Sequence, residues 1–206
     1  MPEPKHRRRA DKRPDEILDA ALACFTEKGF ASTRVEDIAK RADISKATVY
    51  LYFDNKIALL EGLVRRAISP IPDQASAAIA AFPGTVRQTL EMFVTMVVTR
   101  ISDPKIIAIP IMVMRESTTH PELANMYRTE VLEKGLPIVK AIIQKGVDSG
   151  EFRAVDPEMT ARSLIGPVLV HLILSHVFSV GDSGPDGMQK LMKSHLDILM
   201  NGLEAS

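Results

Sequence analysis

Residues 33–53 hold the side chains whose types and spacing suit contacts with nucleic acid. They supply an ammonium group, hydroxyls and phenols, which can donate hydrogen bonds to phosphate oxygens and base edges. Helical periodicity places three of these positions on one face, with Val49 and Phe53 pointing the other way. A short helix presenting a small residue and polar groups outward fits the major groove of DNA. The three outward positions are Lys46, Ala47 and Tyr50.

Two short helices joined by a tight turn would hold this face in place. The apolar residues of the first helix recur at i, i+3, i+4 and i+7. They are Val35, Ile38, Ala39 and Ala42. Thr33 and Glu36 have the spacing of a capping box at its start. Asp43 then ends this helix, and Ser45 can cap the next. The agreement of cap, turn and face favours a helix-turn-helix over an ordinary solvated surface helix.

Charge is distributed unevenly along the 206 residues, although the formal net charge is zero. Residues 1–66 hold 14 Lys and Arg against 11 Asp and Glu, a net of +3, and the remainder has a net of −3. Positive charge therefore accompanies the segment expected to contact DNA, as attraction to phosphate requires. The asymmetry is modest and would not indicate a nucleic-acid-binding protein by itself.

The single cysteine, Cys24, excludes an intramolecular disulfide and a cysteine-cluster metal site. It lies on the apolar face of an expected helix, which favours an inert core thiol over a redox sensor. No continuous apolar stretch follows the basic residues near the N-terminus, so no secretory signal is expected. The longest apolar run, residues 164–180, is short for a bilayer span and contains Pro167. These features predict a cytoplasmic protein with no membrane segment and a buried helix at 164–180.

Helical periodicity and cap signals recur along the chain, whereas alternating strand patterns are scarce. A first helix is expected from about Pro14 to Lys28, with Gly29 as its C-cap. Later helices are expected at about 55–69, 73–82, 85–101, 104–117, 121–148, 157–180 and 186–204. The pattern predicts an all-α protein of nine to ten helices. Its parts are a basic disordered tail (1–13), a helix-turn-helix unit of three helices (14–56) and a larger helical bundle (57–206).

The N-terminal part resembles the tetracycline-repressor (TetR/AcrR) family of bacterial transcription regulators. The long first helix of that family ends in Phe-x-x-x-Gly-Phe, and the sequence here is Phe25-Thr-Glu-Lys-Gly29-Phe30. The helix-turn-helix pattern continues in register with Ile38, Ala39, Ala42, Ser45, Thr48, Tyr50, Tyr52, Phe53, Lys56 and Leu59. The segment 150–153 is similar to a helix junction in many members. The resemblance implies an N-terminal DNA-binding domain and a C-terminal ligand-binding and dimerisation domain.

Two positions depart from the family pattern. Asp43 replaces the usual turn glycine, and Asp tolerates the left-handed backbone conformation better than most residues. Leu51 stands where the family often has an aromatic residue, His or Arg that faces DNA. That change removes a contact or supplies an apolar group for a thymine methyl. The operator sequence therefore does not follow from the resemblance.

The resemblance also implies roles for single residues at the DNA. Thr33 and Arg34 would anchor a phosphate at the start of the second helix, and Lys56 would hold a flanking phosphate. The other implied contacts are Lys46, Ala47 and Tyr50 to bases or adjacent backbone, and Thr48 and Tyr52 to phosphate. The stretch Arg7–Arg13 either tracks DNA or forms a disordered solubilising tail.

A homodimer is expected from the C-terminal helices. The helix at 164–180 is apolar on nearly every side, so it requires both its own core and an external partner. In the family, the last two helices pair with their mates, and two-fold symmetry implies a palindromic operator in double-stranded DNA. The predicted interface residues are Leu164, Val168, Leu172, His176, Leu191, His195 and Leu199.

A pocket for a small apolar effector is the second implication of the resemblance. Methionine suits an adaptable apolar cavity, although ordinary core packing explains many of the same positions. The candidate lining residues are Met92, Met96, Met112, Arg115, Glu116, Tyr127 and His171. A surface ion pair is the alternative for Arg115 and Glu116. His171 and His176 are five positions apart, which is not a shared-face spacing, so no metal and no cofactor are expected.

The resemblance thus implies a repressor that binds its operator as a dimer and is released by an apolar or amphipathic effector. The alternative is a DNA-bound protein that recruits a partner and has no small-molecule effector. A filled bundle core would favour that alternative, and a large apolar cavity would oppose it. An enzyme is not expected, because the chain lacks the usual nucleophile, phosphate-loop and zinc-site motifs.

Overall fold

The computed structural model describes residues 5–204, with side chains described at 12–184 and 186–204. Every regular element of this range is helical, and an isolated bridge joins Phe152 to Glu204. The helices are α1 (Lys5–Lys28), α2 (Val35–Arg41), α3 (Lys46–Tyr50), α4 (Lys56–Ala67), α5 (Pro70–Ala81), α6 (Val86–Ile101), α7 (Pro104–Glu116), α8 (Pro121–Tyr127), the π-helical η1 (Arg128–Leu132), α9 (Glu133–Ser149), α10 (Pro157–His176) and α11 (Pro185–Leu203). Because α8, η1 and α9 run end to end, the described chain has ten continuous helices. The predicted all-α fold is confirmed.

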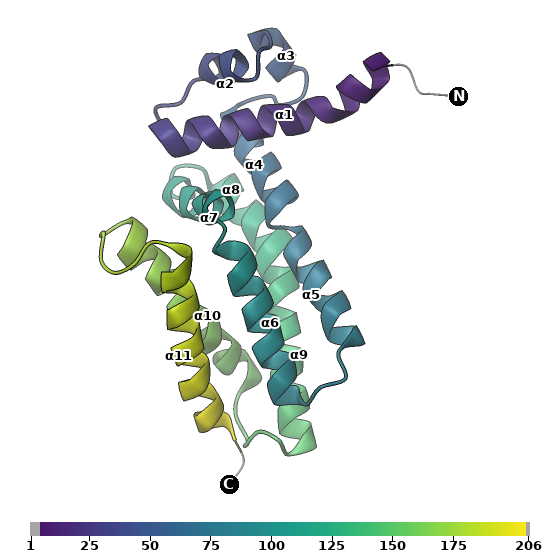
Figure 1. The fold of residues 1–206 in the computed structure, drawn as a ribbon, viewed down its shortest axis with the longest axis vertical. Helices are drawn as coiled ribbons and strands as arrows, with labels where there is room; N and C mark the ends of the chain where they lie inside the picture. Colours follow the sequence, from purple (N-terminus) through teal and green to yellow (C-terminus); the bar gives the residue numbers. More distant parts are fainter. Residues whose placement is uncertain (1–4, 205–206) are drawn as a thin grey trace.

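Helices α1, α2 and α3 form a head at one end of an elongated helical bundle (Figure 1). Helix α1 lies across that end, and α4 leads from the head into the bundle. The apolar centre of the head contains Phe25, Ile38 and Val49, all at most 2% exposed. The same core continues into the bundle through Leu59, Leu63, Ile109 and Leu123. Head and bundle therefore share one apolar core, with α4 at its centre.

The disordered tail expected at 1–13 is wrong for residues 5–13, which form the first turns of α1. Lys, Arg and Ala favour helix, and this preference continues the helix in spite of Pro14. Proline removes a single backbone donor there. An ion pair spans this proline, with Arg13 Nη1 2.8 Å from Glu16 Oε2. Residues 1–4 of the expected tail lie outside the described residues.

The start of α2 differs from the predicted capping box of Thr33 and Glu36. Arg34 is the N-cap residue, and its backbone N–H donates to Asp37 Oδ2 at 3.0 Å. The Thr33 side chain is only 2% exposed, and its hydroxyl donates to the carbonyl oxygen of Gly29 at 2.7 Å. The prediction placed the cap one residue early because Thr–x–x–Glu and Arg–x–x–Asp overlap here.

The turn between α2 and α3 follows the sequence-based expectation. Asp43 has a φ of 54°, the left-handed conformation for which glycine is the usual residue. The Ser45 hydroxyl accepts a hydrogen bond from the Thr48 backbone N–H at 3.0 Å and so caps α3. Together they fix the direction in which α3 leaves the turn.

A second apolar core lies among α6, α9, α10 and α11. Its largest fully buried side chains are Leu90, Ile143, Met188 and Met200. Helix α5 starts at Pro70, earlier than predicted, because a proline is well suited to the first turn of a helix. At the far end, Gly150 ends α9 with a φ of 76°, and Phe152 folds back against Gly146.

The replacement Gly146→Ala should destabilise the bundle. A Cβ atom at residue 146 would lie 2.2 Å from the Phe152 ring, so the ring would have to move. Overpacking of this kind costs about 1–3 kcal/mol in the free energy of unfolding. Gly202→Ala is the matched control, since a Cβ there meets no atom within 4 Å and helical alanine gains about 0.5–1 kcal/mol over glycine. Urea unfolding at fixed protein concentration measures both, and equal stability of Gly146→Ala and the parent would contradict the contact.

Candidate nucleic-acid interface and effector cavity

The outward face of α3 has the residues expected at a DNA-reading surface. Lys46 and Ala47 are exposed, Tyr50 is 42% exposed, and Val49 on the opposite face is fully buried. Just beyond the helix, Leu51 is 81% exposed. The predicted contacts Lys46, Ala47, Tyr50 and, past the helix, Tyr52 are thus on the surface, and Thr48 is partly exposed. Leu51, a prominent apolar group at this surface, was not in the predicted contact set, although its place in the motif pointed to it.

Lys46 is held by two neighbours on the surface. Its Nζ lies 2.5 Å from Glu36 Oε1 on α2 and 5.6 Å from the centre of the Tyr50 ring. The hydrogen bond with Glu36 raises the pKa of Lys46, and the same bond lowers the pKa of Glu36. The ammonium group is therefore charged and oriented along α3. A phosphate that binds Lys46 has to compete with this carboxylate.

Arg34 is exposed at the N-cap of α2. Its side chain is therefore accessible beside the N-terminus of a helix, where the backbone N–H groups favour an anion. This geometry suits the predicted phosphate contact.

Thr33 does not suit the predicted role of phosphate contact. Its hydroxyl is buried and donates to backbone carbonyl oxygens within the head, Gly29 at 2.7 Å and Cys24 at 3.1 Å. The residue instead fixes the loop between α1 and α2. Sequence reasoning could not separate the two roles, since a threonine at a helix start suits either one.

Lys56 also has a structural position instead of a DNA-facing one. Its Nζ donates to the carbonyl oxygens of Phe30, Ala31 and Thr33 at 2.6, 3.0 and 3.0 Å. The ammonium also lies 4.6 Å from the centre of the Phe30 ring. Burial lowers the pKa of Lys56. Since all three N–H donors are used within the protein, the prediction that Lys56 holds a flanking phosphate is wrong for this structure.

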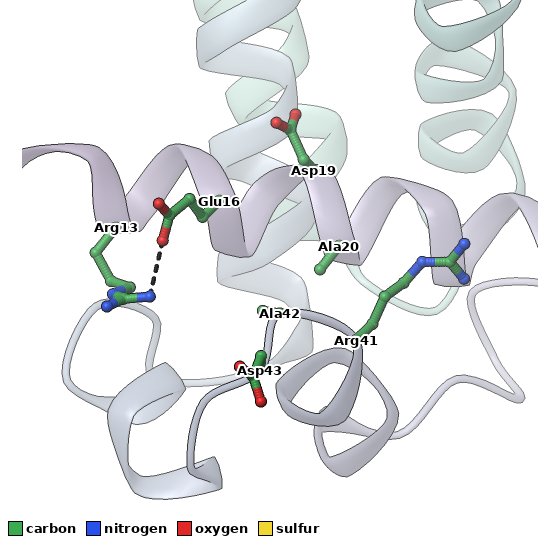
Figure 2. Close-up of a pocket in the computed structure, with 7 residues that line it drawn as sticks. All are labelled: Arg13, Glu16, Asp19, Ala20, Arg41, Ala42 and Asp43. Atoms are coloured by element: carbon green, nitrogen blue, oxygen red, sulfur yellow. Dashed lines mark hydrogen bonds and ion pairs between the residues drawn. The ribbon is translucent and has the colours of Figure 1, made fainter. Parts of the chain in front are cut away.

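A polar groove lies between α1 and the turn that follows α2 (Figure 2). Its walls are Arg13, Glu16, Asp19 and Ala20 on one side and Arg41, Ala42 and Asp43 on the other. The groove holds three carboxylates and two guanidinium groups, and Arg13 is paired with Glu16. This balance of charge does not favour a phosphate in the groove.

The bundle contains an apolar cavity of about 550 Å³ that is partly open to solvent. Residues from α5, α6, α7, α8, η1, α9 and α10 form its wall. Among the lining side chains, the only polar groups are the hydroxyls of Ser117 and Tyr127. Burial raises the pKa of Tyr127 to about 12, so this phenol stays neutral and can donate a hydrogen bond. The cavity is suited to an apolar molecule or to the apolar part of a larger one.

Only one of the seven predicted lining residues, Tyr127, contacts this cavity. Met112, Arg115 and Glu116 line a separate cleft of about 670 Å³ between the head and the bundle. Met96 borders a third, shallower hollow. Met92 and His171 line none of these described cavities.

The helical periodicity of α7 explains why the residues predicted on this helix do not line the apolar cavity. Pro110, Val113 and Ser117 face the apolar cavity, whereas Met112 and Arg115 lie on the other side of the same helix. Composition identified a helix rich in apolar residues, but it could not identify which of its sides faces a cavity.

Three of the seven residues predicted at a dimer interface lie inside their own chain. Leu164 and Leu172 are buried in the core of their own chain, at 2% and 3% exposed, and Val168 lines the apolar cavity. Leu191, His176, His195 and Leu199 are partly buried. The exposed apolar residues of α10 and the loop after it are Met159, Leu169, Val170, Ile173, Leu174, Val177, Phe178 and Val180, and α11 adds Ile198. Because α10 is apolar on nearly all sides, periodicity could not indicate which side faces outward.

The described residues give two negative findings. No helix among them combines the length and apolar character that crossing a bilayer needs. No group of three or more His, Cys, Asp or Glu side chains is arranged there to hold a metal ion.

A helix-turn-helix head on a helical bundle defines a transcriptional regulator with an attached regulatory domain. Family models give the particular group. Residues 17–63 match bacterial regulatory proteins of the tetR family, and residues 83–183 match the tetracyclin repressor-like C-terminal domain. The chain belongs to the TetR family of bacterial transcriptional regulators.

Individual relatives match most of the chain. The HTH-type transcriptional regulator YdeS of Bacillus subtilis is 29% identical over 173 residues, covering 77% of each protein. The fatty acid metabolism regulator protein of B. subtilis is 26% identical over 195 residues, covering 93% of this chain and 97% of the relative. The solved structure of B. subtilis FadR in complex with stearoyl-CoA has a TM-score of 0.75 at 23% identity. It covers 91% of this chain and 98% of FadR, and it confirms the fold.

The replacement Glu36→Gln should raise DNA affinity by roughly two- to fivefold, because phosphate would no longer compete with a carboxylate for Lys46. Glu91→Gln in α6 is the matched control, since it changes the net charge equally but removes a partner of Arg87 in the bundle. Fluorescence anisotropy with a fragment identified by footprinting measures both. A gain of equal size in the control would show that net charge, and not release of Lys46, is responsible.

Proposed function

We propose that this protein is a repressor that binds a palindromic operator as a dimer and releases it when a small apolar or amphipathic effector fills the bundle. The observation that carries this proposal is the apolar cavity of about 550 Å³ beside the end of α4, the helix that leads to the DNA-reading head. Such an activity requires a cytoplasmic location, on the nucleoid when DNA is bound.

The proposed DNA contacts are the exposed groups of α3 and of the start of α2. Lys46, Ala47 and Tyr50 would face the major groove, and Leu51 would offer an apolar contact to a thymine methyl. Arg34, Thr48 and Tyr52 would bind phosphates. Thr33 and Lys56 would support this surface from within the head.

A second copy of the chain is the proposed partner of the exposed face of α10. That face holds Val170, Ile173, Leu174 and Val177, each at least 39% exposed. Ile198 on the neighbouring helix α11 is 68% exposed. Exposed apolar side chains on two helices that pack together suit a two-fold interface, in which the same surface is used by both copies. Two heads related by this axis would read two half-sites of a palindrome.

The cavity favours effectors with an extended apolar part, such as an acyl chain. Its wall carries no charged group, so a charged head group would have to remain at the cavity mouth. Two findings support acyl compounds: the complex of FadR with stearoyl-CoA and the name of the fatty acid metabolism regulator. The cavity also favours an effector-responsive protein over a partner-recruiting one, for which a filled core would be expected.

Addition of stearoyl-CoA should weaken operator binding by about 5- to 150-fold, the range of a typical coupling between two sites. The assay is anisotropy of a footprinted operator fragment, titrated with protein at a fixed salt concentration and with stearoyl-CoA below its micellar concentration. Free coenzyme A is the control for the head group alone. Tight binding of stearoyl-CoA without any change in operator affinity would contradict an effector role.

The replacement Ile173→Glu should dissociate the dimer, since it would bury two unpaired carboxylates across the two-fold axis. Ala77→Glu introduces the same charge on the exposed side of α5 and is the control. Sedimentation velocity measures the oligomeric state, and operator affinity should fall with the loss of the dimer. If Ile173→Glu stays dimeric, another surface forms the interface.

A further inference from the structure

The described chain contains one π-helical segment, η1, between α8 and α9. A π-helix has i→i+5 hydrogen bonds, is rare, and is concentrated at functional sites. Tyr127 directly before η1 and Val131 and Leu132 within it line the apolar cavity. The segment therefore forms part of the proposed effector site and has a backbone geometry that differs from its neighbours.

The side chain of Glu130, inside η1, accepts two hydrogen bonds from residues that do not line the cavity. One carboxylate oxygen accepts from Arg65 Nε at 2.8 Å, and the other accepts from Ser69 Oγ at 3.0 Å. Arg65 belongs to α4, and Ser69 lies between α4 and α5. The bond from Arg65 lowers the pKa of Glu130 and raises that of Arg65. The Glu130 side chain is 26% exposed and Ser69 9%, whereas Arg65 is 53% exposed, so the bond to Ser69 is the better shielded of the two.

Helix α4 connects this contact directly to the DNA-reading head. Lys56 at its first position is bonded to three carbonyl oxygens of the head, and Arg65 lies nine residues further along the same helix. At 1.5 Å per residue, the two positions are about 14 Å apart along a rigid element. A change in the contact of Arg65 thus acts on a helix whose other end fixes the loop before α2.

Arg65 also has a second partner available. Glu61 Oε2, one turn earlier in α4, lies 3.5 Å from Arg65 Nη1. When Glu130 leaves, Glu61 keeps the guanidinium paired, and the Glu130 carboxylate is left to water. Arg65 is therefore paired in both arrangements, as a switch between two states requires.

We propose that Glu130 is a positioning residue that couples the cavity to the head. This inference rests on the proposed function, in which an effector fills the cavity. With the cavity empty, Glu130 holds Arg65 and Ser69, and α4 keeps the head in its DNA-binding position. An occupant that displaces Val131 and Leu132 also moves Glu130, which directly precedes them in η1. A π-turn that tightens to an α-turn rotates its residues about the helix axis. Glu130 then releases α4, Arg65 pairs with Glu61, and the head loses its position.

The test compares operator affinity and stearoyl-CoA affinity in full-length variants. Glu130→Gln should weaken operator binding about 5- to 20-fold without effector and tighten stearoyl-CoA binding, since coupling between sites is reciprocal. The charge-swapped variant Arg65→Glu, Glu130→Arg, built with Glu61→Gln so that two carboxylates do not meet one turn apart in α4, should restore operator affinity to within about threefold of the parent. Glu133→Gln is the matched control, because Glu133 belongs to the same continuous helix and its ion-pair partner is Arg128, which is not part of α4. It should leave both affinities unchanged.

The outcomes separate this inference from the proposed function. Loss of operator affinity in Glu130→Gln, with restoration in the charge-swapped variant, supports the coupling even if stearoyl-CoA does not bind and only the effector class is wrong. Unchanged operator affinity in Glu130→Gln, with a normal response to stearoyl-CoA, overturns the coupling and leaves the proposed function standing. If Glu130→Gln does not fold, the charge-swapped variant decides: a folded variant that binds operator poorly also overturns the inference.

Discussion

One ammonium group fixes the loop between α1 and α2 to the start of α4. Lys56 Nζ binds three carbonyl oxygens of the loop that joins α1 to α2, and its position at the start of α4 connects that loop to the bundle. Charge-assisted hydrogen bonds in a partly buried site are stronger than the same bonds in water. The orientation of α2, and through its turn that of α3, therefore depends on where α4 lies.

The apolar core that the head shares with α4 transmits a movement of α4 to the head. Helix α3 has only five residues, too few to be stable alone, and it stays folded because Val49 is buried in the core that α4 also enters. Packed cores do not deform continuously. A displacement of α4 must therefore be transmitted to the head as a movement of the whole unit, and the reading surface of α3 has to follow.

Helix α7 separates two hollow regions with different chemistry. Its Ile107 lines both the apolar cavity of the bundle and the more polar cleft beneath the head, where Arg115 Nη2 donates to the carbonyl oxygen of His176 at 3.1 Å. An occupant of the cavity thus presses on elements that face the head from two directions: α7, and η1 with its contact to α4. The coupling energy required is small, about 1–3 kcal/mol, compared with the stability of a folded domain.

The sequence determined the helical class, the helix-turn-helix, the family and the cap of α3, because these depend on local periodicity and on side chains within a few residues. Ser45 and Asp43 had the expected roles for that reason. The sides of the helices were decided only by tertiary structure. Leu164 and Leu172 face inward on a helix that is apolar all round, and Met112 lies opposite the cavity-facing side of α7. Lys56 and Glu130 have partners 23 to 65 residues away, and local patterns carry no information about contacts at that separation.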